Sequence, residues 1–408
     1  MIRTGGVYRP VEISAAGRLE VRITTTDVGK RVSVRSLIEH GPPGGRFTDV
    51  VGVLTSWDDG VLRITRKNGE SVLVRESALV AGKVVPSAPA RRRGPAASYE
   101  ELARVAARAW PPVESERLGG WELRAAVGEA PHDGGPPGRS APGERPWGAA
   151  AGRRVGFTRR ANSVLPLGDP GMPLDEALTT VCRWYAERGL PAYVQTATGA
   201  EGTQEALGAE LERRGWVREV TAELWVGGLA PVADAGPEPS GGEPAGVDVL
   251  LSREADEAWL ARYQRRGVNE VALKVLGGGS SRSSQAESGG GPSVWFATVP
   301  AGDGGPGGGA PGGAAPAAIG RCVVDGRWAG FSAVEVDPAL RRRGLASAVM
   351  AALARRALDE GASAAWLQVE EDNAAAHALY GRMGFAAHHS YHHYRAPRSS
   401  APAGDGSP

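Results

Sequence analysis

The sequence has few cysteines, no long apolar run and almost no net charge, and each lack excludes a class of protein. Cys182 and Cys322 lie far apart and match neither a metal-ligand spacing nor a disulfide framework, as in a reducing compartment. No run approaches the ~18 consecutive apolar residues of a membrane span, and residues 1–5 begin no apolar signal core. A net charge of +1 argues against a nucleic-acid coat protein. We therefore expect a cytoplasmic protein that does not enter a membrane.

Glycine (59 residues) and proline (30 residues) are abundant and clustered, and the clusters mark the expected domain borders. Such segments hold few large apolar side chains, so burial cannot offset the entropy of ordering them. They are residues 86–97, 128–152, 229–246, 277–292, 301–316 and 396–408. The predicted organisation is a small β-barrel domain (1–86), a linker (87–97), a second domain (98–228), a linker (229–246), a third domain (247–395) and a disordered tail (396–408).

The first domain is predicted to be all-β. Apolar and polar residues alternate over residues 31–35, 50–54 and 61–64, and Asn68-Gly69 is a hairpin signal. Short strands at close spacing indicate a small barrel. Residues 1–97 hold 16 Lys/Arg and 9 Asp/Glu, a net charge of +7. This charge is either an ordinary solvated face or a docking surface for an acidic partner.

The second and third domains alternate strands and helices, which indicates an α/β fold. In the second domain the expected helices are residues 99–110, 174–188 and 205–214, and the strands are 121–125, 192–196 and 219–226. In the third domain the expected helices are 254–265, 345–358 and 374–383, and the strands are 247–251, 294–299, 318–324, 328–336, 364–369 and 390–395.

A turn in the third domain has the character of a phosphate cradle. The strand that ends at Val336 is followed by an arginine-rich turn that runs directly into a helix. The first helical turn has free N–H groups and partial positive charge, and small residues keep bulk away from an approaching phosphate. The cradle residues are Arg341, Arg342, Arg343, Gly344, Ala346 and Ser347. Taken alone, the turn is also consistent with a solvated basic loop.

The order of these features resembles the GNAT acetyltransferase superfamily. Arg341, Gly344 and Ala346 occupy the positions of its Arg/Gln-x-x-Gly-x-Gly/Ala signature for acetyl-CoA. The family's second motif, Asn…Ala…Leu-Tyr…Gly-Phe, is matched in order by Asn373, Ala376, Leu379, Tyr380, Gly384 and Phe385. The resemblance covers about 150 residues, and it implies a GNAT-like mixed sheet, acetyl-CoA as co-substrate and N-acetylation of a primary amine.

The resemblance also implies roles for individual residues. The pantetheine arm would lie where the strand ending at Val336 separates from its neighbour and would pair with backbone groups of Val334 and Val336. The backbone N–H near Val336 would stabilise the oxyanion. Asn373 and Ala376 would complete the binding of the co-substrate. Tyr380 would protonate the departing thiolate, unless it is only a core aromatic.

The general base is less well specified. Gln368 stands where some relatives carry Glu, and Glu335 is our candidate because strand alternation points it opposite to Val336. Glu335 is otherwise a structural surface carboxylate. Glu370 and a chain of waters are the other possibilities.

Four histidines near the C-terminal end invite a metal interpretation. They are His388, His389, His392 and His393. In a strand they divide between two faces, and no cysteine or carboxylate cluster completes a site. We expect a polar edge strand and no metal.

The second domain ends like a copy of the third, with a helix, Gly215-Trp216 and a strand, which predicts tandem GNAT-like halves. It lacks the Arg-x-x-Gly turn before residue 174, so it is expected not to bind CoA. The first domain resembles the Src-homology-type barrel that precedes some actinobacterial GNAT proteins, through residues 28–32 and 59–62.

Several functions fit this organisation. The leading hypothesis is an N-acetyltransferase that acts on a protein lysine or N-terminus, or on a small molecule. One alternative is an enzyme similar to mycothiol synthase, and another is a CoA-binding regulatory or adaptor module with little turnover. Nucleic acid and membrane are not expected partners, and neither the acceptor nor the oligomeric state follows from the sequence.

Overall fold

A computed structural model describes residues 20–38, 47–86, 94–129, 154–235, 247–263, 270–278, 291–301 and 315–397. The chain divides into two compact units. Unit 1 comprises residues 1–90 and 197–214, and unit 2 comprises residues 91–196 and 215–408. These units divide the chain differently from the predicted domains, because residues 197–214 group with the N-terminal sheet.

Unit 1 is an antiparallel sheet in the order β4-β3-β2-β1-β5. Its elements are β1 (Arg31–Leu37), β2 (Phe47–Asp58), β3 (Val61–Thr65), β4 (Ser71–Arg75), β5 (Leu79–Val84) and α3 (Glu205–Arg213). Alternate apolar residues such as Val32, Val34 and Leu62 are buried in one core, as the alternation predicts. No ladder joins β4 to β5 among the described residues, so the predicted all-β unit is present but its closure into a barrel is not shown.

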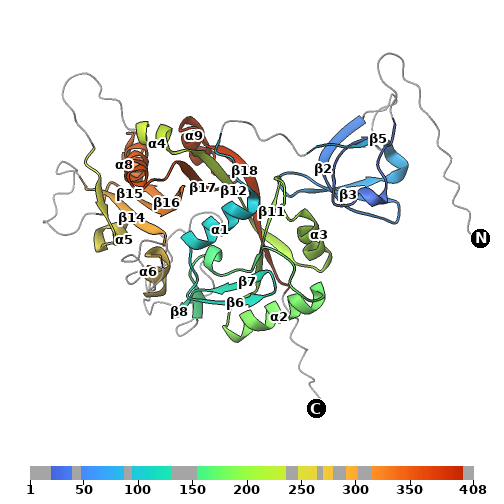
Figure 1. The fold of residues 1–408 in the computed structure, drawn as a ribbon, viewed down its shortest axis with the longest axis horizontal. Helices are drawn as coiled ribbons and strands as arrows, with labels where there is room; N and C mark the ends of the chain where they lie inside the picture. Colours follow the sequence, from blue (N-terminus) through green and yellow to red (C-terminus); the bar gives the residue numbers. More distant parts are fainter. Residues whose placement is uncertain are drawn as a thin grey trace, which may run out of the picture. The chain divides into compact units, whose positions relative to one another are not determined.

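Unit 2 is built on an eight-stranded mixed sheet in the order β11-β18-β12-β17-β16-β15-β14-β13 (Figure 1). Its strands are β11 (Tyr193–Thr198), β12 (Val217–Gly228), β13 (Leu250–Ser252), β14 (Ser293–Val299), β15 (Ala318–Asp325), β16 (Trp328–Val336), β17 (Ala364–Glu370) and β18 (Ala386–Arg395). β16 and β17 pair in parallel, whereas their outer neighbours β15 and β12 pair antiparallel to them. The predicted α/β class with a mixed sheet is therefore confirmed.

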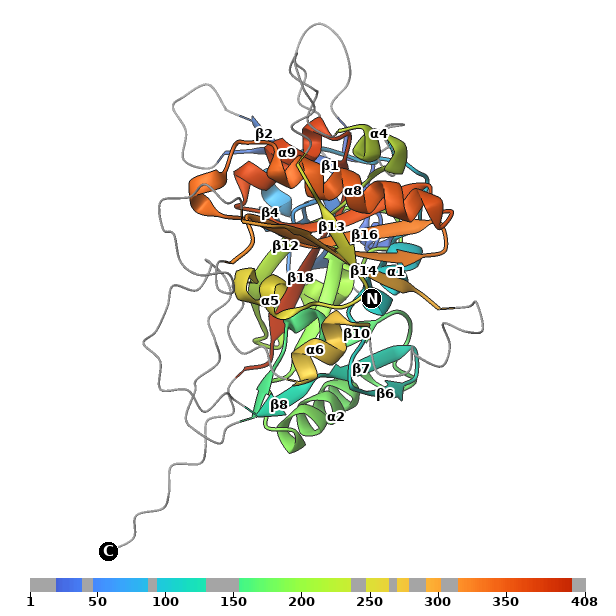
Figure 2. The same cartoon turned by 90° about the vertical axis from the view of Figure 1, so that its left-hand side faces the viewer.

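Helices cover both faces of this sheet (Figure 2). One face, called the α8 face, carries α4 (Leu229–Asp234), α8 (Leu345–Asp359) and α9 (Ala374–Arg382). The other, called the α1 face, carries α1 (Tyr99–Ala109), α5 (Glu257–Arg262) and α6 (Glu270–Leu276). α8 lies close to the sheet because β15 has Gly320 there, where a Cβ atom would come within 2.4 Å of Val349.

The earlier half of unit 2 repeats the plan of the later half on a smaller scale. Its elements are β6 (Glu114–Leu118), β7 (Trp121–Ala125), β8 (Val127–Glu129), β9 (Arg154–Gly156), β10 (Leu165–Pro166) and α2 (Leu174–Glu187). An antiparallel pair, β7 with β10, is followed by a parallel bridge between Val164 and Val194 at β11. The predicted tandem arrangement is thus visible, although β12 from the earlier half lies between β17 and β18 of the later half.

Two differences from the sequence expectations concern segment ends. The first residues of the expected linker 229–246 form α4, in which Leu229 and Val232 are fully buried. The expected helix at residues 254–265 is shorter, because α5 spans only Glu257–Arg262. The tail 398–408 and most of the glycine-rich segments lie outside the described residues. Within the described ranges, no helix is long and apolar enough to cross a membrane.

β18 carries the four histidines, and three of them are deeply buried. His389, His392 and His393 are 3%, 0% and 2% exposed. The Nδ1 atom of His392 lies 2.9 Å from the Thr221 hydroxyl. Burial, and then the positive charge of Arg218, lowers the pKa of His392 to about 3. β18 is thus an inner strand of the sheet between β11 and β12, not the expected edge strand.

The buried His392 predicts acid sensitivity. The pKa of His392 is about 3 in the folded protein and about 6.5 in the unfolded chain. The unfolded chain therefore binds more protons between these values, and the free energy of unfolding falls as the pH falls through this window. Replacing His392 by Gln should make this fall shallower, by at most about 1.4 kcal/mol per pH unit. Urea unfolding measured from pH 7 to pH 4 checks it.

His377→Gln, which removes an imidazole from α9, is the control for that experiment. Wild-type and His392→Gln unfolding energies that decline in parallel with pH would show that His392 is not responsible.

Candidate functional site

The parallel ladder between β16 and β17 is interrupted halfway along the strands. Pairing runs only from Trp328 with Ala364 to Phe331 with Leu367. β16 continues five residues further, to Val336. Over those residues, no strand pairs with the β17-facing edge of β16 within the described part of the chain. A wedge therefore opens between the two strands, bordered by backbone N–H and C=O groups that a ligand can pair with.

A β-bulge lies where the wedge begins. The pairing of β15 with β16 shifts register between Ile319 and Arg321, which puts one extra residue into β16. Ala333 has a φ of +51°, a left-handed conformation that non-glycine residues rarely adopt. Because the extra residue is left unpaired, the bulge provides a backbone N–H at the mouth of the wedge.

The bulge also decides which side chains face which helices. Trp328 packs on the α1 face, whereas Val334 and Val336 pack on the α8 face. Without the extra residue, strict alternation would place all three even-numbered residues on one face. The predicted co-substrate residues Val334 and Val336 therefore lie on the α8 face, half-buried beside the wedge.

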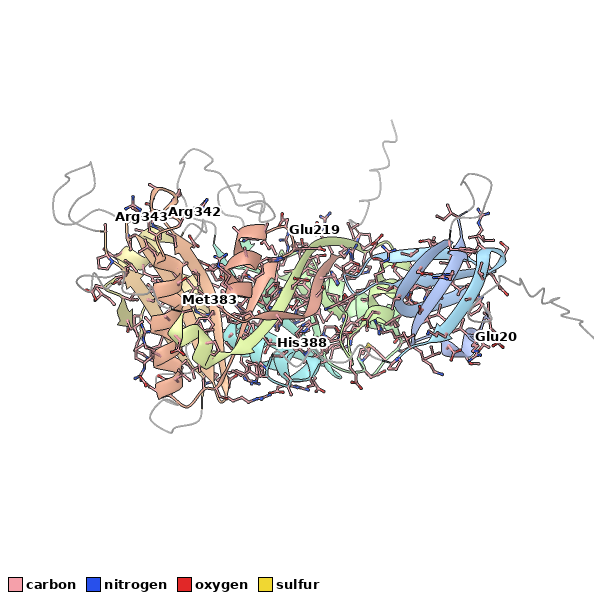
Figure 3. All side chains as sticks on the ribbon, turned by 90° about the horizontal axis from the view of Figure 1, so that it is seen from above. Glu20, Glu219, Arg342, Arg343, Met383 and His388 are labelled. Atoms are coloured by element: carbon pink, nitrogen blue, oxygen red, sulfur yellow. The ribbon has the colours of Figure 1, made fainter. Side chains whose placement is uncertain are left out.

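The amino-terminal end of α8 follows on the same side. Gly344 is the N-cap residue with a φ of +79°, and the first turn contains no acidic residue. Residues 344–347 are half-buried, and Ala348 is the first residue whose N–H bonds within the helix, to the Gly344 carbonyl. Arg341, Arg342 and Arg343 are exposed, and Figure 3 shows the last two projecting from the turn.

This helix end suits an anion, and its counterpart in the earlier half does not. The N–H groups of Leu345, Ala346 and Ser347 precede the first intrahelical donor, so they remain able to bind a phosphate. α2, the equivalent helix, begins at Pro173 and carries Asp175 and Glu176 in its first turn. Those carboxylates would repel a phosphate.

α9 brings the second predicted motif to the α8 face. Ala376 and Tyr380 both pack, half-buried, against the same core cluster as Val334 and Val336. Burial raises the pKa of Tyr380 to about 12. Tyr380 therefore keeps its phenolic proton throughout the neutral range and can act as an acid.

Asn373 has a structural task in this arrangement. It is exposed, and its Oδ1 atom accepts a 3.1 Å hydrogen bond from the Ala376 N–H as the N-cap of α9. Such a cap stabilises a helix by roughly 1 kcal/mol. Asn373 thus orients the helix that carries Tyr380.

The carboxylates lie on the opposite side of the sheet. Glu335 stands between Val334 and Val336, so its side chain points to the α1 face. On β17, Trp366 packs on the α1 face and Leu367 on the α8 face, so Gln368 and Glu370 also point to the α1 face. Glu335 and Glu370 are both half-buried. The acidic side chains are therefore separated from the predicted co-substrate side by the sheet itself.

Arg321 on β15 is a site residue that the sequence analysis missed. It is fully buried, and it donates to the carbonyls of Leu276 (2.8 Å) and Ala109 (2.9 Å) and to the Ser332 hydroxyl (3.3 Å). Two of these acceptors lie at the carboxyl ends of α6 and α1, where a cation is favourable. Arg321 ties both helices to the bulge. The sequence signal that could have identified Arg321 is a single arginine within an otherwise apolar predicted strand.

Metal ligands are the remaining question for this site. Among the residues that the structure describes, no group of three or more His, Cys, Asp or Glu side chains is placed to hold a metal ion. The four histidines of β18 lie on both faces of the strand: His389 contacts the ring of Tyr99, whereas His392 contacts Thr221.

Comparison with known proteins matches the larger part of this chain to one family. The family described as "Probable histone acetyltransferase Rv0428c C-terminal" matches residues 133–394. A protein of Mycobacterium tuberculosis named "Probable histone acetyltransferase Rv0428c" is 28% identical over 253 residues. That alignment covers 62% of this chain and 65% of the relative.

Two solved structures are similar at lower levels. A "GCN5-related N-acetyltransferase from Kribbella flavida" is 18% identical, covers 74% of this chain and 97% of its own, and has a TM-score of 0.44. A "Tandem GNAT protein from the clavulanic acid biosynthesis pathway" is 14% identical, covers 57% of this chain and 73% of its own, and has a TM-score of 0.42. The family assignment rests on the family model.

Gly344→Ala tests the cradle at the start of α8. Alanine at a φ of +79° is strained by roughly 1–2 kcal/mol, and relief of that strain would turn the first N–H groups away from a bound phosphate. We expect the Kd for CoA, measured by calorimetry, to rise about tenfold, which corresponds to about 1.4 kcal/mol.

Gly361→Ala is the matched control, because Gly361 ends the same helix with a φ of +89° and has nothing within 4 Å of its Cβ position. Equal effects of the two substitutions on the Kd would contradict the cradle.

Proposed function

The chain belongs to the family described as "Probable histone acetyltransferase Rv0428c C-terminal", within the GNAT superfamily, and from that premise we propose that it transfers an acetyl group from acetyl-CoA to a primary amine. One observation carries the proposal. The broken β16–β17 ladder and the glycine-led start of α8 adjoin one core cluster, against which Val336 of β16 and Leu345 of α8 both pack. A strand edge and a helix N-terminus on the same face of a sheet suit an elongated ligand that ends in a pyrophosphate.

Residues on the α8 face would hold the donor. The N–H groups of Leu345 to Ser347 and the charges of Arg341 to Arg343 would bind the pyrophosphate. The free edge of β16 at Val334 and Val336 would pair with the amide groups of the pantetheine arm. When bound, acetyl-CoA supplies an acyl thioester. The backbone N–H at the bulge near Ala333 would donate to the oxyanion, in place of the expected donor near Val336.

Tyr380 would supply the proton to the leaving thiolate. A general acid must stay protonated until it is used, and the pKa of Tyr380, raised to about 12 by burial, meets that condition. The resulting products are an amide and a free thiol. Starting from the ammonium form, the nitrogen loses two protons in all: one is released to solvent, and the other balances the proton that the thiolate gains.

The amine would approach from the α1 face. An alkylammonium group has an unperturbed pKa of about 10.4 and must lose a proton before it can attack. Glu335 and Glu370 both point to that face, and Glu335 is nearer to the bulge in sequence. We propose Glu335 as the base, with Glu370 as the second candidate.

The acceptor class remains open to a protein or a small molecule. The relative from Mycobacterium tuberculosis is named as a probable histone acetyltransferase, which supports a protein lysine as one acceptor class. The chain spans only 65% of that relative's length, so the relative's acceptor is a hypothesis for this chain.

Release of free CoA thiol from acetyl-CoA, measured against a panel of amines and lysine peptides, tests the reaction. We expect acetyl-CoA-dependent thiol release with at least one amine, and a mass increase of that amine by one acetyl group. Thermal stabilisation by acetyl-CoA without thiol release for any amine would instead support a CoA-binding module.

Tyr380→Phe separates chemistry from binding. Loss of a general acid lowers kcat by roughly 100-fold to 10,000-fold, whereas the KM for acetyl-CoA should change little because the ring is retained. Because burial raises the pKa of Tyr380 to about 12, the wild-type rate should not decline between pH 8 and pH 10 through loss of this proton. A kcat within twofold of wild type would remove Tyr380 from the mechanism.

A further inference from the structure

A polar hollow lies on the α1 face, next to the end of β17. Its lining residues are Thr158, Arg159, Arg160, Val220, Ala222, Glu370, Tyr391 and His393. The hollow measures about 320 Å³, including the part that is open to solvent.

The lining is rich in hydrogen-bond donors that have no partner. His393 is 2% exposed, and neither of its ring nitrogens is hydrogen-bonded. The Thr158 hydroxyl and the Nε atom of Arg160 are also buried without a partner. Tyr391 accepts a 3.2 Å hydrogen bond from Arg160, so its own proton can be donated to a ligand.

The charged residues that line the hollow are Arg159, Arg160 and Glu370. Arg159 is paired with Glu219 at 3.1 Å, but no carboxylate among the described residues lies within ion-pair distance of Arg160. The Arg160 guanidinium instead lies 5.5 Å from the centre of the Trp110 ring. Burial, and then the charges of Arg159 and Arg160, holds the pKa of His393 well below its usual value. His393 is therefore neutral and can donate one N–H.

The backbone around Thr158 is held in an uncommon conformation. Thr158 has a φ of +54°, which costs a β-branched residue energy. The Asn162 side chain fixes this turn through hydrogen bonds to the carbonyls of Phe157 (2.8 Å) and Thr158 (3.0 Å). Strained residues of this kind persist where the surrounding structure over-determines them, often at ligand sites. Here the strain presents the Thr158 hydroxyl to the hollow.

The position of the hollow connects it to the reaction. Ala222 pairs with both Glu370 and Tyr391, so the hollow spans β17, β12 and β18 at the level of Glu370. β16 and β17 run in parallel beyond the break at Phe331 and Leu367. Ala333, two residues beyond Phe331, therefore lies within about one residue (~3 Å along the strand) of the level of Glu370. An acceptor on the α1 face can therefore reach from the hollow to the bulge.

We propose that this hollow binds a carboxylate group of the acceptor amine. The identification of the ligand as the acceptor rests on the proposed function. The presence of a carboxylate site in the hollow does not depend on that function. A carboxylate only accepts hydrogen bonds, so it matches a set of donors, and bonds from a guanidinium to it are charge-assisted.

Succinate and succinamide are the probes, because they have the same carbon skeleton and differ in charge. Thermal unfolding of the full chain is followed against each compound at matched ionic strength. Succinate should raise the Tm saturably, whereas succinamide should not. The succinate midpoint is the succinate concentration that gives half of the maximal rise in Tm. Arg160→Gln should raise this midpoint at least tenfold. Arg117→Gln, which removes a charge from exposed β6, is the matched control and should leave the midpoint unchanged.

Thr158→Val is the second variant, because loss of the stacking on Trp110 could unfold Arg160→Gln. It removes one donor and no charge, and it should raise the succinate midpoint severalfold. Equal shifts by succinate and succinamide, or an unchanged midpoint in both variants, would overturn the site. Acetyl-CoA is titrated separately: stabilisation by succinate but not by acetyl-CoA leaves the carboxylate site standing and removes the proposed function.

Discussion

The end of the β16–β17 ladder at Phe331 and Leu367 is the feature on which unit 2 depends. A parallel pair that stopped without a cause would leave two strand edges without partners, which is unfavourable in a protein interior. Here the bulge at Ala333 turns the strand, and Arg321 holds the bulge to the ends of α1 and α6 through three hydrogen bonds. The desolvation of a buried arginine is offset by those carbonyls, and the wedge stays open.

A related arrangement recurs in the earlier half of the same unit. Arg124 on β7 is as buried as Arg321 on β15, and it donates to the carbonyl and hydroxyl of Ser163 just before β10. Each half therefore places a buried arginine beside a serine that is adjacent in sequence to its parallel pairing. The halves differ at the following helix, because α2 begins with carboxylates where α8 begins with a left-handed glycine. The two halves share this frame, whereas acidic residues occupy the first turn of α2 and not that of α8.

The sheet separates two chemical environments. The α8 face has the glycine-led helix and a tyrosine that keeps its proton, whereas the α1 face has carboxylates, arginines and the donor-lined hollow. The insertion of β12 between β17 and β18 makes this possible, because it brings Val220 and Ala222 of the earlier half beside Tyr391 of the later half. The earlier half thus contributes residues to the α1 face of the shared sheet.

Local sequence patterns predicted most of the helices and strands and the proposed acetyl-CoA motif. Alternation and helical spacing predicted most strands and helices, because burial of one face imposes a period on the chain. The residues of the Arg341–Ala346 turn and of the Tyr380 motif lie close together in the sequence, so both motifs can be recognised from it. Tertiary structure alone decided the rest. Ala333 carries no sign of a positive φ, α4 begins inside a glycine-rich stretch, and Thr158, Glu370 and His393 come together through strand pairing across more than 200 residues. Such contacts depend on tertiary packing, and no local sequence pattern predicts them.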